Sequence, residues 1–386
     1  MMKISQFHIF FTLVFIIYSI GNLYIFFKGY SFVPRAGRVT YTIIFIPLAA
    51  AFIAAKFLEI KYSTVFSDIL NITGGFWIAF LFYGFIFFFL SDILFLLFRL
   101  TGILQAENIP LYRKWAFILT LSFSSLLILG GFINAVSPVI KKYELSVPKQ
   151  TDGISTMRIA AVSDIHLGSI IRKRSIRKLS AILKEINPDV VFLLGDIIDG
   201  ELGSVLRGDL LKYFTGPGTK DGLYAITGNH EYIGGADRTI PYIESRGIRI
   251  LKDEMIVLPG GIQVAGRLDR DSYRYLGKKR MPLGELIKNA DSSFPLILLD
   301  HQPLQLDEAV KHGIDLQLSG HTHRGQLWPL NYVIDRIYEV GYGYRKKGDT
   351  HIIVSSGFGL WGPRVRTSGR SEVLRVDVKF TANRQK

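Results

Sequence analysis

Aspartate, asparagine and histidine residues recur directly after short apolar runs in the C-terminal half of the chain. The runs span 159–163, 190–194, 223–227, 296–300 and 314–319, and each has the length and apolar character of a buried strand. The polar residues that follow them are Asp164, His166, Asp196, Asp199, Asn229, His230, His301, His321 and His323. Ligands of an α/β sheet bind beyond the carboxyl ends of its strands. We therefore expect these side chains to meet at one edge of a sheet.

The types and spacing of these residues are typical of a metal centre. Side chains alternate along an extended chain, so Asp164 and His166 point to the same side and can grip one ion, as can His321 and His323. Carboxylate, amide and imidazole ligands without sulfur suit Mn²⁺, Fe or Zn²⁺ better than Ca²⁺. Two such ions sharing a carboxylate clamp the attacking and leaving oxygens of an in-line displacement and lower the pKa of bound water. The pattern predicts a two-metal centre that acts on a phosphate ester.

The elements around these runs predict a layered α/β domain. Helices are expected at 172–186, 237–246 and 304–312, between the strands, and further strands at 351–355 and 372–378. Alternating strands and helices followed by more strands indicate a mixed α/β layer structure.

The N-terminal part has a different composition. The chain has 386 residues, 49% of them hydrophobic, and a mean hydropathy of +0.27. Four apolar stretches, at 7–27, 39–58, 76–98 and 116–137, approach the ~20 residues that a membrane-crossing helix needs. We therefore expect a transmembrane domain of four helices over 1–140, a linker over 141–156 and a second domain over 157–386.

The charges suggest which partners the chain has. A formal net charge of +14 on a membrane protein favours attraction to anionic lipid headgroups. No nucleic-acid-binding motif is visible, so no nucleic acid partner is expected, and zero cysteines exclude disulfides and thiolate metal sites. Basic residues near the span ends are almost evenly divided between the two sides. Lys28, Arg35 and Arg38 follow the first span and favour a cytoplasmic loop there, which puts the second domain on the outer side. Asp92 lies inside the third span, where a place near the membrane interface or pairing within the helix bundle is favoured over a functional role.

The strand-end motifs together resemble those of the calcineurin-like metallophosphoesterase superfamily. They read Ser163-Asp164-Ile165-His166, Gly195-Asp196-x-x-Asp199, Gly228-Asn229-His230-Glu231, His301-x-Pro303 and Gly320-His321-Thr322-His323, in that family's order. The match runs from about Met157 to the end of the chain. The resemblance implies a four-layer α/β/β/α sandwich after the transmembrane helices.

The resemblance also implies a role for each motif residue. Asp164, His166 and His323 would hold the first of two divalent ions, with Mn²⁺ favoured and Fe or Zn²⁺ as alternatives. Asn229, His301 and His321 would hold the second, and Asp196 would bridge the two. His230 would contact the phosphoryl oxygens and protonate the leaving group, and Asp199 would accept a hydrogen bond from His230 and orient it.

The segment 355–364 resembles a branch of bacterial membrane-associated phosphoesterases, of the cell-wall phosphodiesterase and UDP-2,3-diacylglucosamine pyrophosphatase types. This branch implies a multi-pass protein of the bacterial cytoplasmic membrane with lipid-linked substrates. The chain departs from it at Arg324, where glycine is common, and at Asp300, where serine is common. Arg324 and Arg364 are candidate substrate contacts through charge-assisted hydrogen bonds to phosphate, and Arg366 is a further one.

Two functions are compatible with the pattern. One is a phosphoesterase that cleaves phosphoester or diphosphate bonds with metal-bound hydroxide, on a substrate at the membrane. The other is a catalytically silent membrane sensor or scaffold with the same fold. The complete ligand set favours the enzyme, because a scaffold has no need of His230 together with Asp199.

Overall fold

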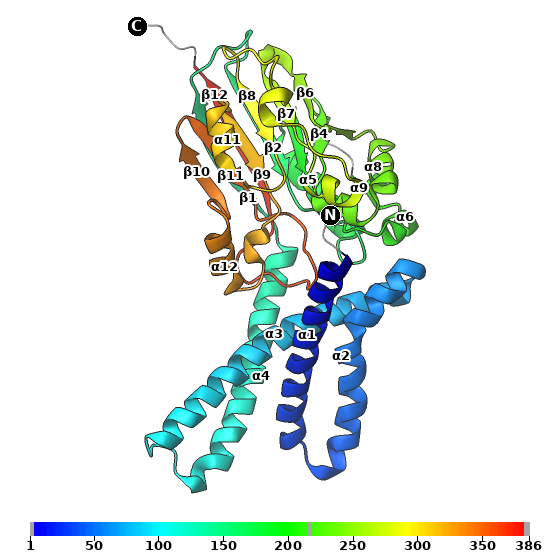
Figure 1. The fold of residues 1–386 in the computed structure, drawn as a ribbon, viewed down its shortest axis with the longest axis vertical. Coiled ribbons are helices and arrows are strands. Elements are labelled where there is room, and N and C mark those ends of the chain that lie inside the picture. The colour runs from blue at the N-terminus through cyan, green and yellow to red at the C-terminus, as the bar shows by residue number, and fades with distance from the viewer. Residues whose placement is uncertain (1–3, 215–217, 382–386) are drawn as a thin grey trace. The chain divides into compact units, whose positions relative to one another are not determined.

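The computed structural model describes residues 4–214 and 218–381 (Figure 1). The chain divides into two compact units. The helical unit comprises Met1–Ile133 and Gly362–Val365, and the sheet unit comprises Asn134–Trp361 and Arg366–Lys386.

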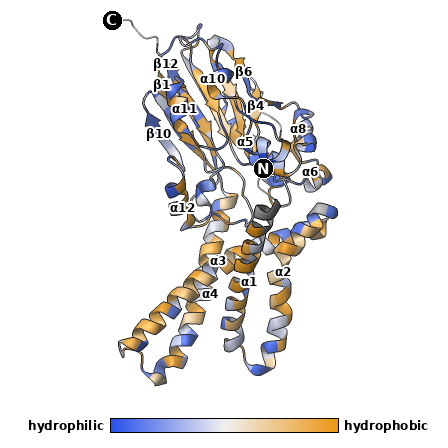
Figure 2. Cartoon of the chain, in the orientation of Figure 1, coloured by the Kyte–Doolittle hydropathy of each residue, from blue (hydrophilic) through white to orange (hydrophobic). Residues whose placement is uncertain are grey.

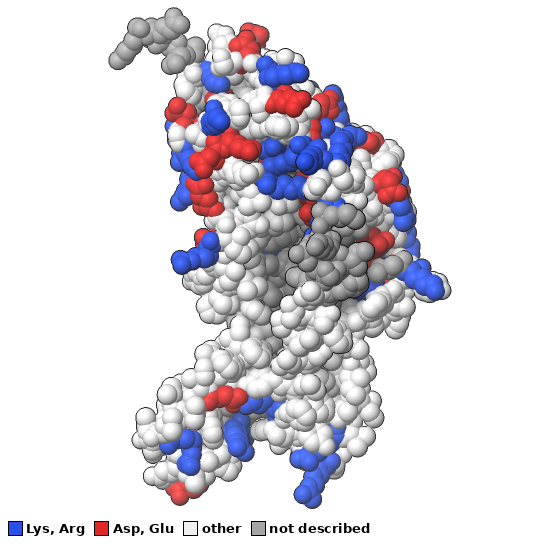
Figure 3. Space-filling model, viewed as in Figure 1, with Lys and Arg blue, Asp and Glu red and all other residues white. Residues whose placement is uncertain are grey.

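Four long helices form the first part of the chain. They are α1 (Ile4–Phe32), α2 (Arg38–Lys61), α3 (Val65–Leu100) and α4 (Ile109–Val136). Each is long and apolar enough to cross a membrane, and the hydropathy colouring in Figure 2 shows apolar residues along all four. On the face drawn in Figure 3, few charged side chains lie on these helices. The four apolar helices predicted from the sequence are therefore present.

The third helix is longer than its apolar stretch. The sequence predicts a span that begins at residue 76, whereas α3 begins at Val65. Thr64 and Ser67 cap its start reciprocally, since the Ser67 N–H donates to Thr64 Oγ1 (3.2 Å) and the Thr64 N–H to Ser67 Oγ (2.9 Å). Asp68 and Asn71 in the first turns are buried. The apolar stretch seen in the sequence does not include these polar residues. The helix does include them, because they are buried within the helical unit.

Asp92 pairs inside the helical unit, as the sequence favoured. It accepts a hydrogen bond from the Tyr24 hydroxyl (2.5 Å) and forms an ion pair with Lys28. The Lys28 ammonium also lies 5.3 Å from the centre of the Tyr24 ring. The carboxylate therefore has a hydroxyl donor and a cation from α1 within the same unit.

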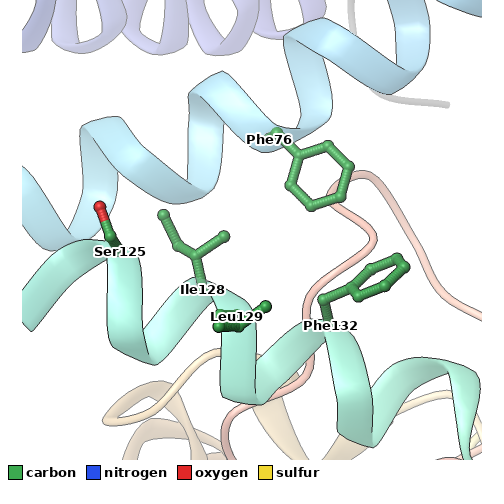
Figure 4. A pocket seen from close by; sticks show the side chains of 5 residues that line it. All are labelled: Phe76, Ser125, Ile128, Leu129 and Phe132. Atoms are coloured by element: carbon green, nitrogen blue, oxygen red, sulfur yellow. The ribbon is translucent and has the colours of Figure 1, made fainter.

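A cavity of about 360 Å³ lies between α3 and α4. Figure 4 shows its lining, with Phe76 from α3 and Ser125, Ile128, Leu129 and Phe132 from α4. Apart from the Ser125 hydroxyl the lining is apolar.

The sheet unit contains two six-stranded sheets. The first has the order β1 (Val139–Val147), β12 (Glu372–Phe380), β2 (Thr156–Val162), β3 (Val190–Leu194), β4 (Leu223–Ile226) and β5 (Arg249–Ile250). The second has the order β10 (Gly343–Lys347), β11 (Thr350–Val354), β9 (Leu316–Ser319), β8 (Leu296–Leu299), β7 (Gln263–Gly266) and β6 (Glu254–Val257). Strands β2 to β5 are parallel to one another, as are β7, β8, β9 and β11.

The sheets pack face to face, and helices cover their outer sides. Along β8, Ile297 and Leu299 belong to the core shared by both sheets, whereas Leu296 and Leu298 belong to a second core with residues of α10 (Leu283–Leu286) and α11 (Leu306–Lys311). This division follows the period of two along a strand. Helix α5 (Lys173–Ile186) connects the parallel strands β2 and β3, and the inner face of that sheet is already occupied, so α5 covers the outer face. The predicted four-layer α/β/β/α sandwich is confirmed.

The segment predicted as a linker is partly a strand. Residues 139–147 form β1, which pairs in parallel with β12 from Val139 opposite Glu372 to Val147 opposite Phe380. Proline and glycine at 138, 148 and 153 and a broken hydrophobic pattern suggested a linker. Lys141 and Lys142 interrupt that pattern because charged residues are common on an edge strand, where they oppose further pairing. The expected linker over 141–156 is corrected to the residues between β1 and β2.

The remaining short helices lie between the strands. They are α6 (Gly203–Gly208), α7 (Asn229–Ile233), α8 (Ala236–Glu244), α9 (Asp271–Leu276) and α12 (Leu330–Ile337). The sequence analysis did not predict α12 or β10.

Candidate metal centre

The predicted ligands stand just beyond the carboxyl ends of five strands. Asp164 and His166 follow β2, Asp196 and Asp199 follow β3, Asn229 and His230 open α7 after β4, His301 follows β8, and His321 and His323 follow β9. The first three strands belong to one sheet and the last two to the other. The side chains therefore converge where the ends of both sheets meet.

One group of ligand atoms comes from Asp164, His166 and His323. The Nε2 atoms of the two histidines are 3.0 Å apart, and Asp164 Oδ1 lies 3.5 Å from His323 Nε2 and 3.9 Å from His166 Nε2. All three residues are buried. These three atoms can hold one metal ion.

A second group comes from Asp196, His301 and His321, which can also hold an ion. Asp196 Oδ2 lies 3.2 Å from His301 Nε2, and Asn229 Oδ1 lies 2.9 Å from His321 Nδ1. Asp196 Oδ2 is also 3.8 Å from His166 Nε2 in the first group. Asp196 therefore stands between the two groups.

The hydrogen bonds around the histidines show that the centre fits cations. His301 donates through Nδ1 to the Leu194 carbonyl oxygen (2.6 Å), which leaves a lone pair on Nε2, facing Asp196. This Nε2 is buried and has no hydrogen-bond partner. His166 likewise donates through Nδ1 to the Asp199 carboxylate (3.1 Å) and turns its Nε2 to the first group. Buried acceptors that face one another are unfavourable without a cation between them, and metal-ligating histidines are held in this way.

The electrostatics of the buried cluster act in two directions. Burial lowers the pKa of His301 and of His166, but the neighbouring carboxylates outweigh it, so both net shifts are upward. Burial lowers the pKa of His323 to about 3 and that of His321 to about 4. Burial raises the pKa of Asp196, but His301 and the other histidines outweigh it, so the net shift is downward. Neutral imidazoles and ionised carboxylates are the forms that bind a divalent ion.

His230 and Asp199 lie beside the two groups. Asp199 Oδ1 is 3.4 Å from His230 Nδ1 and 3.1 Å from His166 Nδ1. The expected hydrogen bond from His230 to Asp199 is not formed. His166 donates to Asp199, and His230 Nδ1 has no hydrogen-bond partner. The His230 backbone N–H donates to Asp196 Oδ1 (2.8 Å), which fixes the start of α7 against the cluster.

Glu231 has a structural role that was not predicted from the sequence. This buried carboxylate accepts four backbone N–H groups, from Gly228 (2.7 Å), Ile197 (2.8 Å), Asp196 (3.0 Å) and Ile198 (3.1 Å). Burial raises its pKa to about 7. It therefore ties the loop after β3 to the start of α7. The available signal was a glutamate three residues after Gly228, the spacing of a capping box.

Two glycines let the loops approach closely. A Cβ on Gly228 would collide with the Asp196 carboxylate, and a Cβ on Gly320 would collide with the Ser163 hydroxyl and the Asp164 carboxylate. The glycines of both motifs are therefore required by the spacing of the ligand loops.

The structure places the three candidate arginines outside the ligand groups. Arg324 stacks over the Tyr342 ring (4.4 Å), and Arg364 belongs to the helical unit and lies over the Phe132 ring (5.6 Å). Arg366 is buried, with Nη2 donating to the Gly359 carbonyl oxygen (2.9 Å) and lying 3.2 Å from His323 Nδ1. Arg366 therefore packs behind His323, one of the predicted ligands, and is closed to solvent.

Asp300 departs from the family pattern for a structural reason. It is buried and forms ion pairs with Arg267 (3.3 Å) and Arg280 (3.0 Å). These pairs anchor the backbone directly before His301.

Comparison with known proteins agrees with this geometry. The family model described as calcineurin-like phosphoesterase matches residues 157–325. An uncharacterized metallophosphoesterase of Aquifex aeolicus is 31% identical over 247 residues, which cover 63% of this chain and 93% of that protein. A zebrafish protein named transmembrane protein with metallophosphoesterase domain is 29% identical over 279 residues, 68% of this chain and 62% of its own length. The chain thus spans less than two thirds of that relative.

Among solved structures, a dimetal phosphatase from zebrafish has 10% sequence identity and a TM-score of 0.34, with coverage of 51% of this chain and 86% of its own. The sequence relatives decide the class: the chain belongs to the calcineurin-like metallophosphoesterase family. It combines that domain with four apolar helices, and its family indicates a metal-dependent hydrolase.

Proposed function

We propose that this protein hydrolyses phosphoester or diphosphate bonds at a dinuclear metal centre, on a lipid-linked or membrane-proximal substrate. The observation that carries the proposal is the convergence of buried acceptor atoms around Asp196. The Nε2 of His301 points at this carboxylate, 3.2 Å away. Burying these groups together costs folding free energy, and a bound cation would offset that cost.

We infer the ligands from the donor set. Asp164, His166 and His323 would hold one ion, Asn229, His301 and His321 the other, and Asp196 would bridge them. Mixed carboxylate, amide and imidazole donors suit Mn²⁺, with Fe or Zn²⁺ as alternatives. When bound, two divalent ions supply Lewis-acid stabilisation of the phosphoryl charge and make water a nucleophile at neutral pH.

His230 is the residue placed to move a proton. Its Nδ1 lies 3.4 Å from Asp199 Oδ1, which leaves Nε2 to protonate the departing oxygen. Glu231, the neighbouring residue, keeps the start of α7 fixed through its four backbone hydrogen bonds.

The lipid-linked substrate is supported by chain connectivity. Strand β1 begins at Val139, three residues after α4 ends at Val136. Each residue spans at most ~3.6 Å, so the catalytic unit starts at the end of a candidate membrane helix. Phosphoesters at the bilayer surface are the substrates within reach of such a unit.

The test is hydrolysis of bis(p-nitrophenyl) phosphate by the purified full chain with added Mn²⁺. We expect turnover that chelation abolishes and Mn²⁺ restores. His323→Ala should remove it, and His312→Ala, which changes a histidine outside the ligand groups, should not. Activity that survives chelation would refute the mechanism. The substrate class is tested separately with lipid-borne and water-soluble diphosphates, and preference for the soluble ones would count against the lipid assignment.

A further inference from the structure

Helix α12 presents an apolar stripe to solvent. Leu330, Val333 and Ile337 recur at the spacing of one helix face, and they are 38%, 51% and 63% exposed. Trp328, directly before the helix, is 44% exposed. We call these four residues the apolar stripe. Contiguous exposed apolar groups of this size mark a surface that another phase or partner covers.

A second exposed tryptophan is tied to the same segment. Trp361, 62% exposed, exchanges two hydrogen bonds with the Gln326 side chain, as donor through its N–H (3.1 Å) and as acceptor through its carbonyl (2.8 Å). Gln326 is two residues before Trp328 in the sequence. Tryptophan is enriched where one side of a surface is apolar and the other is wet.

Hydrogen bonds within the sheet unit connect this segment to the end of α4. The Trp328 N–H donates to Thr367 Oγ1 (2.8 Å), and the neighbouring Arg366 carbonyl accepts from Asn134 Nδ2 (3.2 Å). Ser371 Oγ donates to the Ala135 carbonyl oxygen (3.1 Å). Asn134 and Ala135 belong to the last turn of α4 and to the sheet unit. The start of α12 is therefore bonded to a loop that is itself bonded to the last turn of a candidate membrane helix.

We propose that the apolar stripe lies in the headgroup region of the bilayer that α4 crosses. An amphipathic helix with an apolar face and flanking aromatic residues lies in the interface plane, with that face ~5–10 Å into the headgroup boundary. Arg336, exposed beside Val333 on the helix surface, meets anionic headgroups there. Asp335, on the opposite side of the helix from Ile337, stays in water. The occupant is a lipid surface, and not a protein partner.

The stripe also bears on the choice of substrate. The 3-10 turn η5 (His323–Gly325) carries a ligand histidine, and its Gly325 packs against the backbone of Leu330 and Asn331 so closely that a Cβ would clash. An interfacial α12 therefore holds the ligand loop at the depth of lipid phosphates. The proposed contact of α12 with the membrane does not depend on hydrolysis. Its consequence for the choice of substrate rests on the proposed function.

The chain has no cysteines, so single-cysteine labelling of the full-length protein needs no background mutations. Ile337→Cys, carrying a nitroxide, is reconstituted in vesicles of phosphatidylethanolamine and phosphatidylglycerol. Collision rates with oxygen and with a water-soluble nickel chelate are then compared. Asp335→Cys on the same helix and Val257→Cys, 65% exposed on β6, are the matched controls.

The expected result is oxygen contact without nickel contact at residue 337, and nickel contact at residues 335 and 257. Nickel contact at 337 equal to that at 335 would place the stripe in water and overturn the proposal. Protection of 337 from both reagents would identify a protein partner and overturn it too. A protein that hydrolyses no phosphoester in the earlier assay would defeat the proposed function while leaving this measurement valid. If both proposals hold, Val333→Asp with Ile337→Asp should lower the ratio of lipid-borne to soluble turnover about tenfold, as expected for lost interfacial burial.

Discussion

Both units of the chain hold a carboxylate within a cluster of polar side chains, but they surround it differently. Asp92 in the helical unit meets groups that can donate, the Tyr24 hydroxyl and the Lys28 ammonium. Asp196 in the sheet unit faces the Nε2 of His301. The Nδ1 of the same ring donates a hydrogen bond to the Leu194 carbonyl oxygen. The first carboxylate is satisfied by the chain itself. The second accepts the His230 backbone N–H but lies among several imidazoles, and an added positive charge, on a metal ion or as a proton on His301, balances it.

This difference gives a physical criterion for telling a structural polar cluster from a ligand cluster. A structural cluster balances donors against acceptors, and changing it alters stability alone. A ligand cluster gathers acceptors, so both its stability and its activity depend on a metal.

The largest effect should come from replacing Asp196, the proposed bridging ligand. Asp196→Ala should lower hydrolysis about 10⁴-fold, because neither ion is then held in the shared geometry. The same variant separates metal binding from catalysis. Mn²⁺ at one hundred times its Kd stabilises the folded wild type by about 2.7 kcal/mol, so its melting temperature should rise with Mn²⁺. Asp196→Ala should show a much smaller rise. Equal Mn²⁺ stabilisation of both proteins would contradict the ligand assignment.

His230→Ala should lower kcat by about 10²- to 10³-fold, within the range for a general acid. The loss should depend on the leaving group, since p-nitrophenolate departs readily without a proton and an alkoxide does not. Comparing kcat for p-nitrophenyl and alkyl phosphodiesters measures this. The melting temperature rise with Mn²⁺ should be retained, which distinguishes His230 from the ligands. The same loss for both leaving groups would show that His230 does not act as the acid.

The sequence predicted the ligand cluster because each motif is local. Asp164 and His166, for example, sit directly after a strand whose apolar run is readable without any other part of the chain. Glu231 was missed because its partners, Asp196 to Ile198, lie more than thirty residues away in the sequence. Strand β1 was also missed, because the pairing of Val147 with Phe380 joins distant segments.

The arginine candidates show that residues close in sequence can lie in different surroundings. Arg364 and Arg366 are two residues apart in the sequence, yet one lies over Phe132 in the helical unit and the other is buried behind His323. Position in a motif identifies a residue's neighbourhood along the chain. Which way a loop side chain turns depends on packing that only the folded structure reveals.

Glu231→Gln should have an intermediate effect, on stability. Its amide nitrogen would face backbone N–H groups that now donate to a carboxylate. Charged hydrogen bonds of this kind contribute about 1.5–3 kcal/mol, so thermal melts should show a loss in that range. Glu254→Gln is the matched control, because its ion pair with Arg249 is exposed and such pairs contribute ~0–1 kcal/mol. A stability loss no larger than the control's would mean that Glu231 does not hold the loop after β3.

The smallest effect should come from changing the Lys28–Asp92 ion pair of the helical unit. This change tests whether Asp92 is satisfied by the chain itself. Lys28→Met and Asp92→Asn, alone and combined, form a double-mutant cycle for the ion pair. Interactions of this kind between membrane helices average ~0.6 kcal/mol, so a coupling of about 1 kcal/mol or less is expected from thermal melts in vesicles. Because the Asp92 carboxylate already has the Tyr24 hydroxyl and Lys28 as partners, none of the three variants should change the Mn²⁺ dependence of stability or of turnover. A change in that dependence would give Asp92 a role in the metal chemistry and remove the distinction between satisfied and cation-requiring carboxylates.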